Sequence, residues 1–159
     1  MPKQQRQSED NIGRPDSVGP RNPRADTSSI ERSWHLFDAK DQVLGRLATK
    51  VAKLLMGKEK PTRVPYLDRG DYVVVVNAAK VAVTGKKETQ KRYFRYSGYP
   101  SGLKSENLGE LRKRRPQEII RHAVVGMLPK NKLSSRMITR LFVYPEEEGE
   151  MVSRAKEGK

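Results

Sequence analysis

The chain has 159 residues, of which 35% are hydrophobic and 33% are charged, so it can form one domain with a modest core. Its formal net charge is +14, and because such an excess of cations repels itself in a compact fold, we expect a polyanionic partner, with nucleic acid first and an anionic membrane surface second. The absence of cysteine excludes disulfides, thiolate zinc sites and thiol catalysis, and no apolar run approaches the roughly 18 residues of a membrane span or forms a signal-peptide core.

Residues 1–33 are predicted to form a flexible, disordered arm. They contain many prolines and polar residues and almost no apolar ones, so they cannot bury enough surface to offset the entropy of ordering. Arginines alternate with aspartates and glutamates in this arm, and the acidic content argues against an organelle transit peptide. We expect a single folded domain at residues 34–144 and a short polar, acidic tail at residues 145–159.

The domain is predicted to begin with a strand at Trp34–Asp38 and a helix at Leu44–Met56, with Asp41 or a neighbour as its cap. Apolar residues recur at helical spacing and give the helix an inner face of Leu44, Leu47, Val51, Leu54 and Leu55. Cations line the opposite side of the helix and the loop that follows Gly57, namely Arg46, Lys50, Lys53, Lys58 and Lys60.

Further strands and helices alternate along the chain. The unbroken β-branched run at Tyr72–Asn77 is typical of a strand buried on both faces, which places helices on both sides of a sheet. Shorter strands are predicted at Lys80–Gly85, Arg92–Tyr96 and Leu141–Tyr144. Helices are predicted at Glu106–Lys113 and at Pro116–Leu128, the second with an inner face of Ile119, Ile120, Ala123, Val124 and Met127. This alternation indicates an α/β layered domain.

The segment 84–102 has the composition of an RNA-binding surface. It combines closely spaced cations with aromatics and glycines, and these can neutralise phosphates, stack on unpaired bases and let the backbone approach a strand of RNA. We expect at least one of Tyr93 and Phe94 to lie in the core because strand residues alternate between faces. The predicted contacts in and beside this segment are Lys86, Lys87, Lys91, Arg92, Arg95, Tyr96, Ser97, Gly98, Tyr99 and Lys104.

The stretch Gly126–Leu133 carries an apolar helix end directly into a proline, two lysines and an asparagine. Because Pro129 cannot continue the helix, Lys130, Asn131 and Lys132 are predicted to lie exposed on a kinked connector. A short helix should follow at residues 133–141, with Arg136 and Arg140 together on its outer face. The sequence has no acidic residue from Ile119 to Tyr144, so these cations are predicted to bind RNA.

The chain shows no pattern that indicates catalysis or metal binding. It lacks a phosphate-binding loop, a dinucleotide fingerprint and the paired histidines of a zinc protease, and His35 and His122 stand far apart without acidic or cysteine neighbours at metal spacing. The aspartates Asp38 with Asp41, and Asp68 with Asp71, could form pairs for acid/base catalysis or magnesium binding, but they lie at element boundaries where aspartate caps helices and makes turns. We therefore predict no catalytic residue, metal or cofactor.

Four ordered blocks carry a resemblance to a known family. These blocks are Leu44–Lys58, Gly70–Lys87, Tyr93–Lys104 and Arg115–Leu133. In this order they resemble the L-thirteen family of large-subunit ribosomal proteins, in its bacterial or organellar form. The resemblance implies a three-layer α/β/α domain with a mainly parallel four-stranded sheet, no enzymatic activity, and an early-assembling role on large-subunit rRNA beside neighbouring ribosomal proteins.

The resemblance further implies a cytoplasmic location in a bacterial ribosome, or an organellar ribosome as the alternative. Neither a membrane nor a small-molecule substrate is expected as a partner. From another class, a nucleotide- or phosphate-handling α/β enzyme is the second hypothesis, and a peripheral membrane-binding protein is the third. The long arm and the acidic tail depart from a typical bacterial member, so the resemblance assigns neither of them a role.

Overall fold

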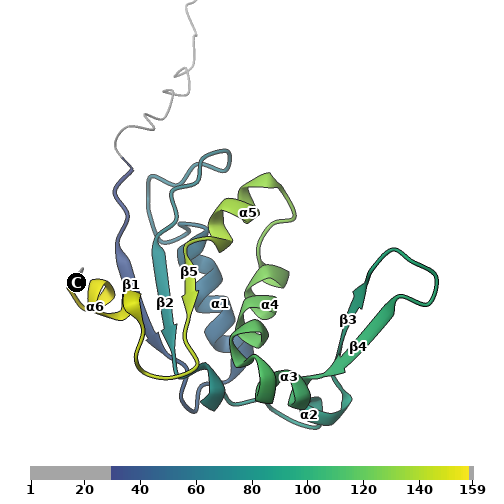
Figure 1. Cartoon of the computed structure of the whole chain (residues 1–159). Helices are drawn as coiled ribbons and strands as arrows, with labels where there is room; N and C mark the ends of the chain where they lie inside the picture. Colours follow the sequence, from purple (N-terminus) through teal and green to yellow (C-terminus); the bar gives the residue numbers. More distant parts are fainter. Residues whose placement is uncertain (1–29, 158–159) are drawn as a thin grey trace, which may run out of the picture.

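The computed structural model describes residues 30–157, and most of the arm predicted at residues 1–33 lies outside this range (Figure 1). In chain order the elements are β1 (Trp34–Asp38), α1 (Leu44–Leu55), β2 (Tyr72–Val76), the 3-10 helix η2 (Ala78–Lys80), α2 (Lys87–Gln90), β3 (Arg92–Tyr96), β4 (Leu103–Asn107), α3 (Leu108–Arg114), α4 (Pro116–Met127), α5 (Lys132–Ile138), β5 (Leu141–Val143) and α6 (Glu150–Glu157). The alternation of strands and helices confirms the predicted α/β class.

The main sheet has three parallel strands in the order β1-β2-β5. Its central strand β2 is the β-branched run, and Val73, Val74 and Val75 are fully buried. Val73 and Val75 belong to the cluster that includes α1, whereas Val74 belongs to a second cluster with α6. The prediction that this strand is buried on both faces is therefore confirmed.

The four-stranded sheet implied by the resemblance is wrong for this chain. Beside the three-stranded sheet, the described residues form a separate antiparallel pair, β3 with β4. The predicted strand at Lys80–Gly85 does not form, because Asn77 adopts a left-handed conformation (φ 58°) and turns the chain into η2 directly after β2. Only isolated bridges remain there, from Val81 to Lys40 and from Ala82 to Val43.

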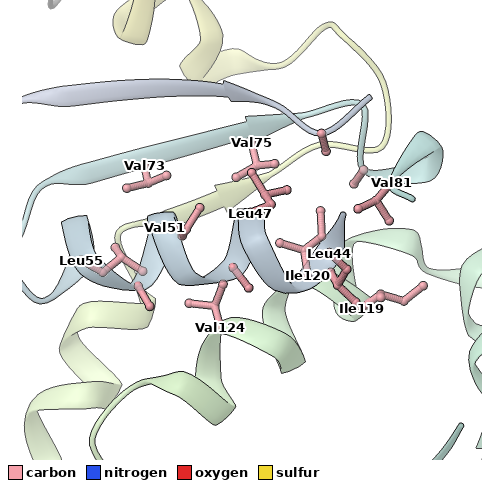
Figure 2. Close-up of a cluster of buried hydrophobic side chains, with 14 of the residues drawn as sticks. Leu44, Leu47, Val51, Leu55, Val73, Val75, Val81, Ile119, Ile120 and Val124 are labelled. Atoms are coloured by element: carbon pink, nitrogen blue, oxygen red, sulfur yellow. The ribbon is translucent and has the colours of Figure 1, made fainter. Parts of the chain in front are cut away.

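Helix α1 lies between the sheet and α4, and the main core forms on its two sides (Figure 2). Leu47, Val51 and Leu55 are fully buried, as the helical spacing predicted. Ile120 and Val124 of α4 are also fully buried. Each such side chain contributes roughly 1.5–3 kcal/mol when it leaves water, so this layer fixes α1 in place and leaves its cationic side free.

The stretch predicted to be a polar tail carries helix α6, which covers the other face of the sheet (Figure 1). Val152 and Ala155 are buried against Val74 and Val76. At the edge of this cluster the Trp34 and Tyr72 rings stack with centroids 4.5 Å apart. The packed region therefore extends past residue 144, and the sheet has helices on both faces.

Several predicted boundaries move in the structure. Helix α3 begins at Leu108 rather than Glu106, because β4 precedes it and the Asn107 amide donates to the Glu110 carboxylate at 3.3 Å. Helix α1 has Val43 at its N-cap position and no side-chain cap, so the predicted side-chain cap from Asp41 or a neighbour does not form. Met127, predicted to face inward, is 41% exposed at the last turn of α4.

Candidate nucleic-acid interface

The outer side of α1 is cationic, as predicted. Arg46, Lys50 and Lys53 are all exposed, and Lys58 is exposed in the turn that follows. The apolar residues of the same helix are packed between the sheet and α4, so the helix cannot rotate to hide these charges. The result is a row of cations on a rigid element, which suits contact with successive phosphates.

Lys60 differs from these cations because its charge is used inside the protein. Its ammonium lies 2.5 Å from the carboxylate of Asp71 and donates to the Glu31 carbonyl at 2.7 Å. Asp71 is buried and also accepts the Ser33 amide at 2.9 Å. Lys60 therefore ties the chain before β1 to the start of β2, and it offers little free charge to an outside partner.

Strands β3 and β4 form a hairpin that projects from the body of the domain beyond α3 (Figure 1). Tyr93 lies on the face directed to the domain, where its ring stacks on His122 with centroids 5.2 Å apart. Burial raises the pKa of the Tyr93 phenol above its ordinary value, because this environment disfavours the charged phenolate. Its neighbour Phe94 is 66% exposed, which confirms that one of the two residues packs inward.

The tip of the hairpin is a defined turn. Gly98 has a φ of 85°, in the region that favours glycine. The Ser97 amide donates to the Gly102 carbonyl at 3.2 Å, and the Gly102 amide donates to the Tyr99 carbonyl at 2.9 Å. The turn holds Tyr99 outward with 77% of its surface exposed.

Around the hairpin the predicted cations all reach the surface. The exposed residues are Lys86, Lys87, Lys91, Arg92, Arg95 and Lys104. The exposed group also includes Tyr96 and Ser97 next to the turn. Together these side chains make the hairpin and its base a second basic surface.

The connector after α4 has the predicted form. Helix α4 ends at Met127, and Lys130, Lys132 and Arg136 are exposed beyond it. The Asn131 side chain accepts the Ser134 amide at 3.1 Å and so caps α5. Asn131 therefore has a structural task that fixes the direction of the cations beside it.

The expectation that Arg140 lies exposed beside Arg136 is wrong. Arg140 is only 5% exposed, its guanidinium pairs with Asp68, and it also donates to the Leu55 carbonyl at 3.4 Å. The reason is that α5 ends at Ile138, two residues earlier than a helix that would carry both arginines on one face. Arg140 ties the loop after α1 to the start of β5.

A groove lies beside the base of the hairpin, between the starts of α1 and α2 and the end of α4. It has a volume of about 630 Å³. Lys87 and Lys91 line it together with Gly45 and Gly126, and no aspartate or glutamate does so. The Thr49 hydroxyl lies 3.6 Å from the Met127 sulfur, so the cationic side of α1 adjoins the end of α4 that leads to Lys130.

Three of the four aspartates that could have formed catalytic pairs are engaged in contacts within the domain, and the fourth, Asp41, is exposed. The Lys40 amide and then the Asn77 side chain hold the pKa of Asp38 below its ordinary value, while Asp68 pairs with Arg140 and Asp71 with Lys60. Within residues 30–157 no group of three or more acidic or histidine side chains is placed to hold a metal ion. None of the helices in that range is long and apolar enough to cross a membrane.

Comparison with known proteins identifies the family. Residues 32–150 match the family model described as Ribosomal protein L13. The chain belongs to this family. It is 56% identical over 118 residues to the large ribosomal subunit protein uL13 of Cyanothece sp., covering 74% of this chain and 79% of that protein. The protein of the same name from Caldanaerobacter subterraneus is 55% identical over 120 residues, which are 76% of this chain and 84% of that protein.

Two surface features of this member of the L13 family were not predicted from the sequence. One is the exposed face of the hairpin that includes Phe94 and Leu103, because β4 was not recognised as a strand. The other is the groove over Gly45 and Gly126, which forms only when α1 and α4 pack. The sequence could have indicated the groove. Glycine destabilises a helix interior, so Gly45 and Gly126 within predicted helices point to places where the absence of a side chain leaves space.

Proposed function

We propose that the chain is a structural constituent of the large ribosomal subunit that binds its rRNA and supports early assembly. The match to the Ribosomal protein L13 family over residues 32–150 is the observation that carries this proposal. Membership of a ribosomal protein family decides against the enzymatic hypothesis and against a membrane-binding protein. As part of a bacterial-type ribosome, the chain works in the cytoplasm beside other large-subunit proteins.

The basic segments give this function a physical mechanism. Cations on α1, on the hairpin and on the connector are spread over separate elements of one rigid domain, so each can neutralise phosphates of a different RNA segment. The domain then acts as a clamp that holds these RNA segments at a fixed spacing, because its sheet is packed rigidly between helices on both faces. Such binding depends on charge and shape rather than on the reading of a base sequence.

We assign RNA contacts to the exposed members of the predicted set. They are Arg46, Lys50, Lys53, Lys58, Lys86, Lys87, Lys91, Arg92, Arg95, Tyr96, Ser97, Gly98, Tyr99, Lys104, Lys130, Lys132 and Arg136. Lys60 and Arg140 are left out because ion pairs within the domain hold their charges, and Asn131 because its side-chain oxygen caps α5.

The function is tested by following a tagged chain through a sucrose gradient of cell extract. The chain should sediment with large subunits, and high salt or ribonuclease should release it, because electrostatic contacts to RNA hold it there. A chain that stays at the top of the gradient while native large subunits form would refute the proposal.

The groove offers a sharper test of where the RNA lies. A Cβ added at Gly126 would meet no atom within 4 Å, so Gly126→Leu fits the fold and replaces glycine by a better helix former. We expect the melting temperature to stay the same or rise by a few degrees, since about 0.5–1 kcal/mol of helix propensity is gained. RNA affinity should fall several-fold because the new side chain fills the groove.

Binding and melting are measured on the same preparation by fluorescence anisotropy and calorimetry. Gly109→Ala is the control, since its Cβ would meet only the Glu88 carbonyl at 3.4 Å and Gly109 does not line the groove. Unchanged RNA affinity in Gly126→Leu would show that the groove stays outside the interface.

A further inference from the structure

The β3–β4 hairpin has two chemically different faces. Directly opposed residues of antiparallel strands project to the same side, and the register pairs Phe94 with Ser105 and Tyr96 with Leu103. Alternation along each strand puts all of them on one face, together with Arg92. The other face carries Tyr93 opposite Glu106 at its base and the opposed pair Arg95 and Lys104 nearer the tip.

The first face, defined by Phe94, Tyr96 and Leu103 and called the aromatic face, is left open to solvent. These side chains are 66%, 64% and 61% exposed. They are the largest group of exposed apolar side chains on one face among the described residues, since the remaining ones are spread over a loop, the hairpin tip and α4. A two-stranded ribbon with an uncovered apolar face is only marginally stable in water. We therefore expect another molecule to cover the aromatic face.

The second face indicates the charge of that molecule. Arg95 and Lys104 stand directly opposite each other, an arrangement that repels unless an anion lies between them. The segment 91–107 contains Lys91, Arg92, Arg95 and Lys104, and its one acidic residue, Glu106, is paired with Arg114 at the base of the hairpin. A polyanion therefore complements this hairpin on both sides, and among polyanions only a nucleic acid also offers flat apolar surfaces.

Bases can stack on the aromatic face only where they are unpaired. In a duplex the base faces are covered by neighbouring base pairs, whereas loops and junctions expose them to aromatic side chains. Phe94 and Tyr96 are alternate residues of β3, so their rings are spaced along the strand and each can receive one of two successive unstacked bases. Arg92, which precedes Phe94 on the same face, can neutralise a phosphate at that end of the stacked bases.

We propose that the hairpin recognises unpaired nucleotides, with bases stacked on Phe94 and Tyr96 and the phosphates of a second RNA segment bound by Arg95 and Lys104. This inference rests on the proposed function and makes it more specific. The hairpin contributes selectivity for single-stranded loops or junctions of the rRNA, while the cations of α1 and the connector bind backbone of any structure.

The test compares a mixed-sequence single-stranded RNA oligonucleotide with the duplex that it forms with its complement. Phe94→Leu combined with Tyr96→Leu keeps apolar side chains and removes the rings. Loss of two stacking contacts should lower single-strand affinity by about tenfold to a hundredfold, with the duplex affinity and the salt slope unchanged. Phe94→Tyr combined with Tyr96→Phe exchanges the two rings and should bind like the parent chain.

Tyr66→Ala is the matched control, because Tyr66 is 52% exposed on the loop between α1 and β2, away from the hairpin. It should leave both affinities unchanged. Circular dichroism checks that the leucine variant keeps its fold, and Phe94→Ser alone repeats the measurement if it does not.

Equal loss of single-strand and duplex affinity would overturn the proposal, as would no loss at all. A leucine variant with normal RNA affinity but poor incorporation into large subunits would show that the aromatic face docks on a neighbouring protein. Either result leaves the proposed function standing, because that function fails only if the parent chain itself does not sediment with large subunits.

Discussion

The affinity of the chain for large-subunit rRNA should fall by about a thousandfold or more between roughly 50 and 200 mM monovalent salt. The reason is that each phosphate neutralised by a lysine or arginine releases condensed counterions, and some six to ten such contacts produce a loss of this size. The exposed cations on α1, the hairpin and the connector are numerous enough to make them. Fluorescence anisotropy with an rRNA fragment across a salt series measures the slope.

Charge-matched variants locate the contacts. Lys130→Gln combined with Lys132→Gln should make the salt slope shallower by about one unit for each lost phosphate contact. Arg154→Gln combined with Lys156→Gln removes the same charge from α6, on the opposite side of the sheet, and should leave the slope unchanged. If both pairs change the slope equally, the binding is non-specific attraction to net charge and the connector has no special place in it.

The sequence correctly predicted the elements in which the spacing of apolar residues follows the faces that are buried. The spacing of Leu47, Val51 and Leu55 predicted α1, and the uninterrupted valines predicted β2, because the layers that cover them are apolar all along their length. The segment Lys80–Gly85 shows the limit of this reasoning. Its alternation suits a strand, but Asn77 turns the chain away from the sheet and Val81 is buried without joining it.

The same contrast holds for the interface. Tyr96 and Tyr99 were predicted to be exposed because they flank a glycine turn, and local sequence decides such a turn. Arg140 was predicted to share an outer face with Arg136, and its true position depends on Asp68, which lies 72 residues earlier in the chain. No local pattern encodes a partner at that separation, so burial of this cation becomes evident only in the fold.

Asp68→Ala should be among the most destabilising single substitutions outside the apolar core. It leaves the Arg140 guanidinium buried without its counter-charge, since the Arg140 and Asp68 side chains are only 6% and 11% exposed. Removal of one partner from a buried pair costs about 3–5 kcal/mol, because the remaining charge has lost both water and its ion partner. Urea denaturation gives the change in the free energy of unfolding.

Glu88→Ala is the matched control for Asp68→Ala, because Glu88 pairs with Arg112 at the surface, where its side chain is 51% exposed. Water replaces the lost carboxylate there, so the cost should stay below about 1 kcal/mol. Asp68→Leu combined with Arg140→Met replaces both charges by apolar groups and should recover most of the stability lost in Asp68→Ala. Equal costs for Asp68→Ala and Glu88→Ala would mean that water reaches Arg140 in solution, and Arg140 would then return to the set of cations available to RNA.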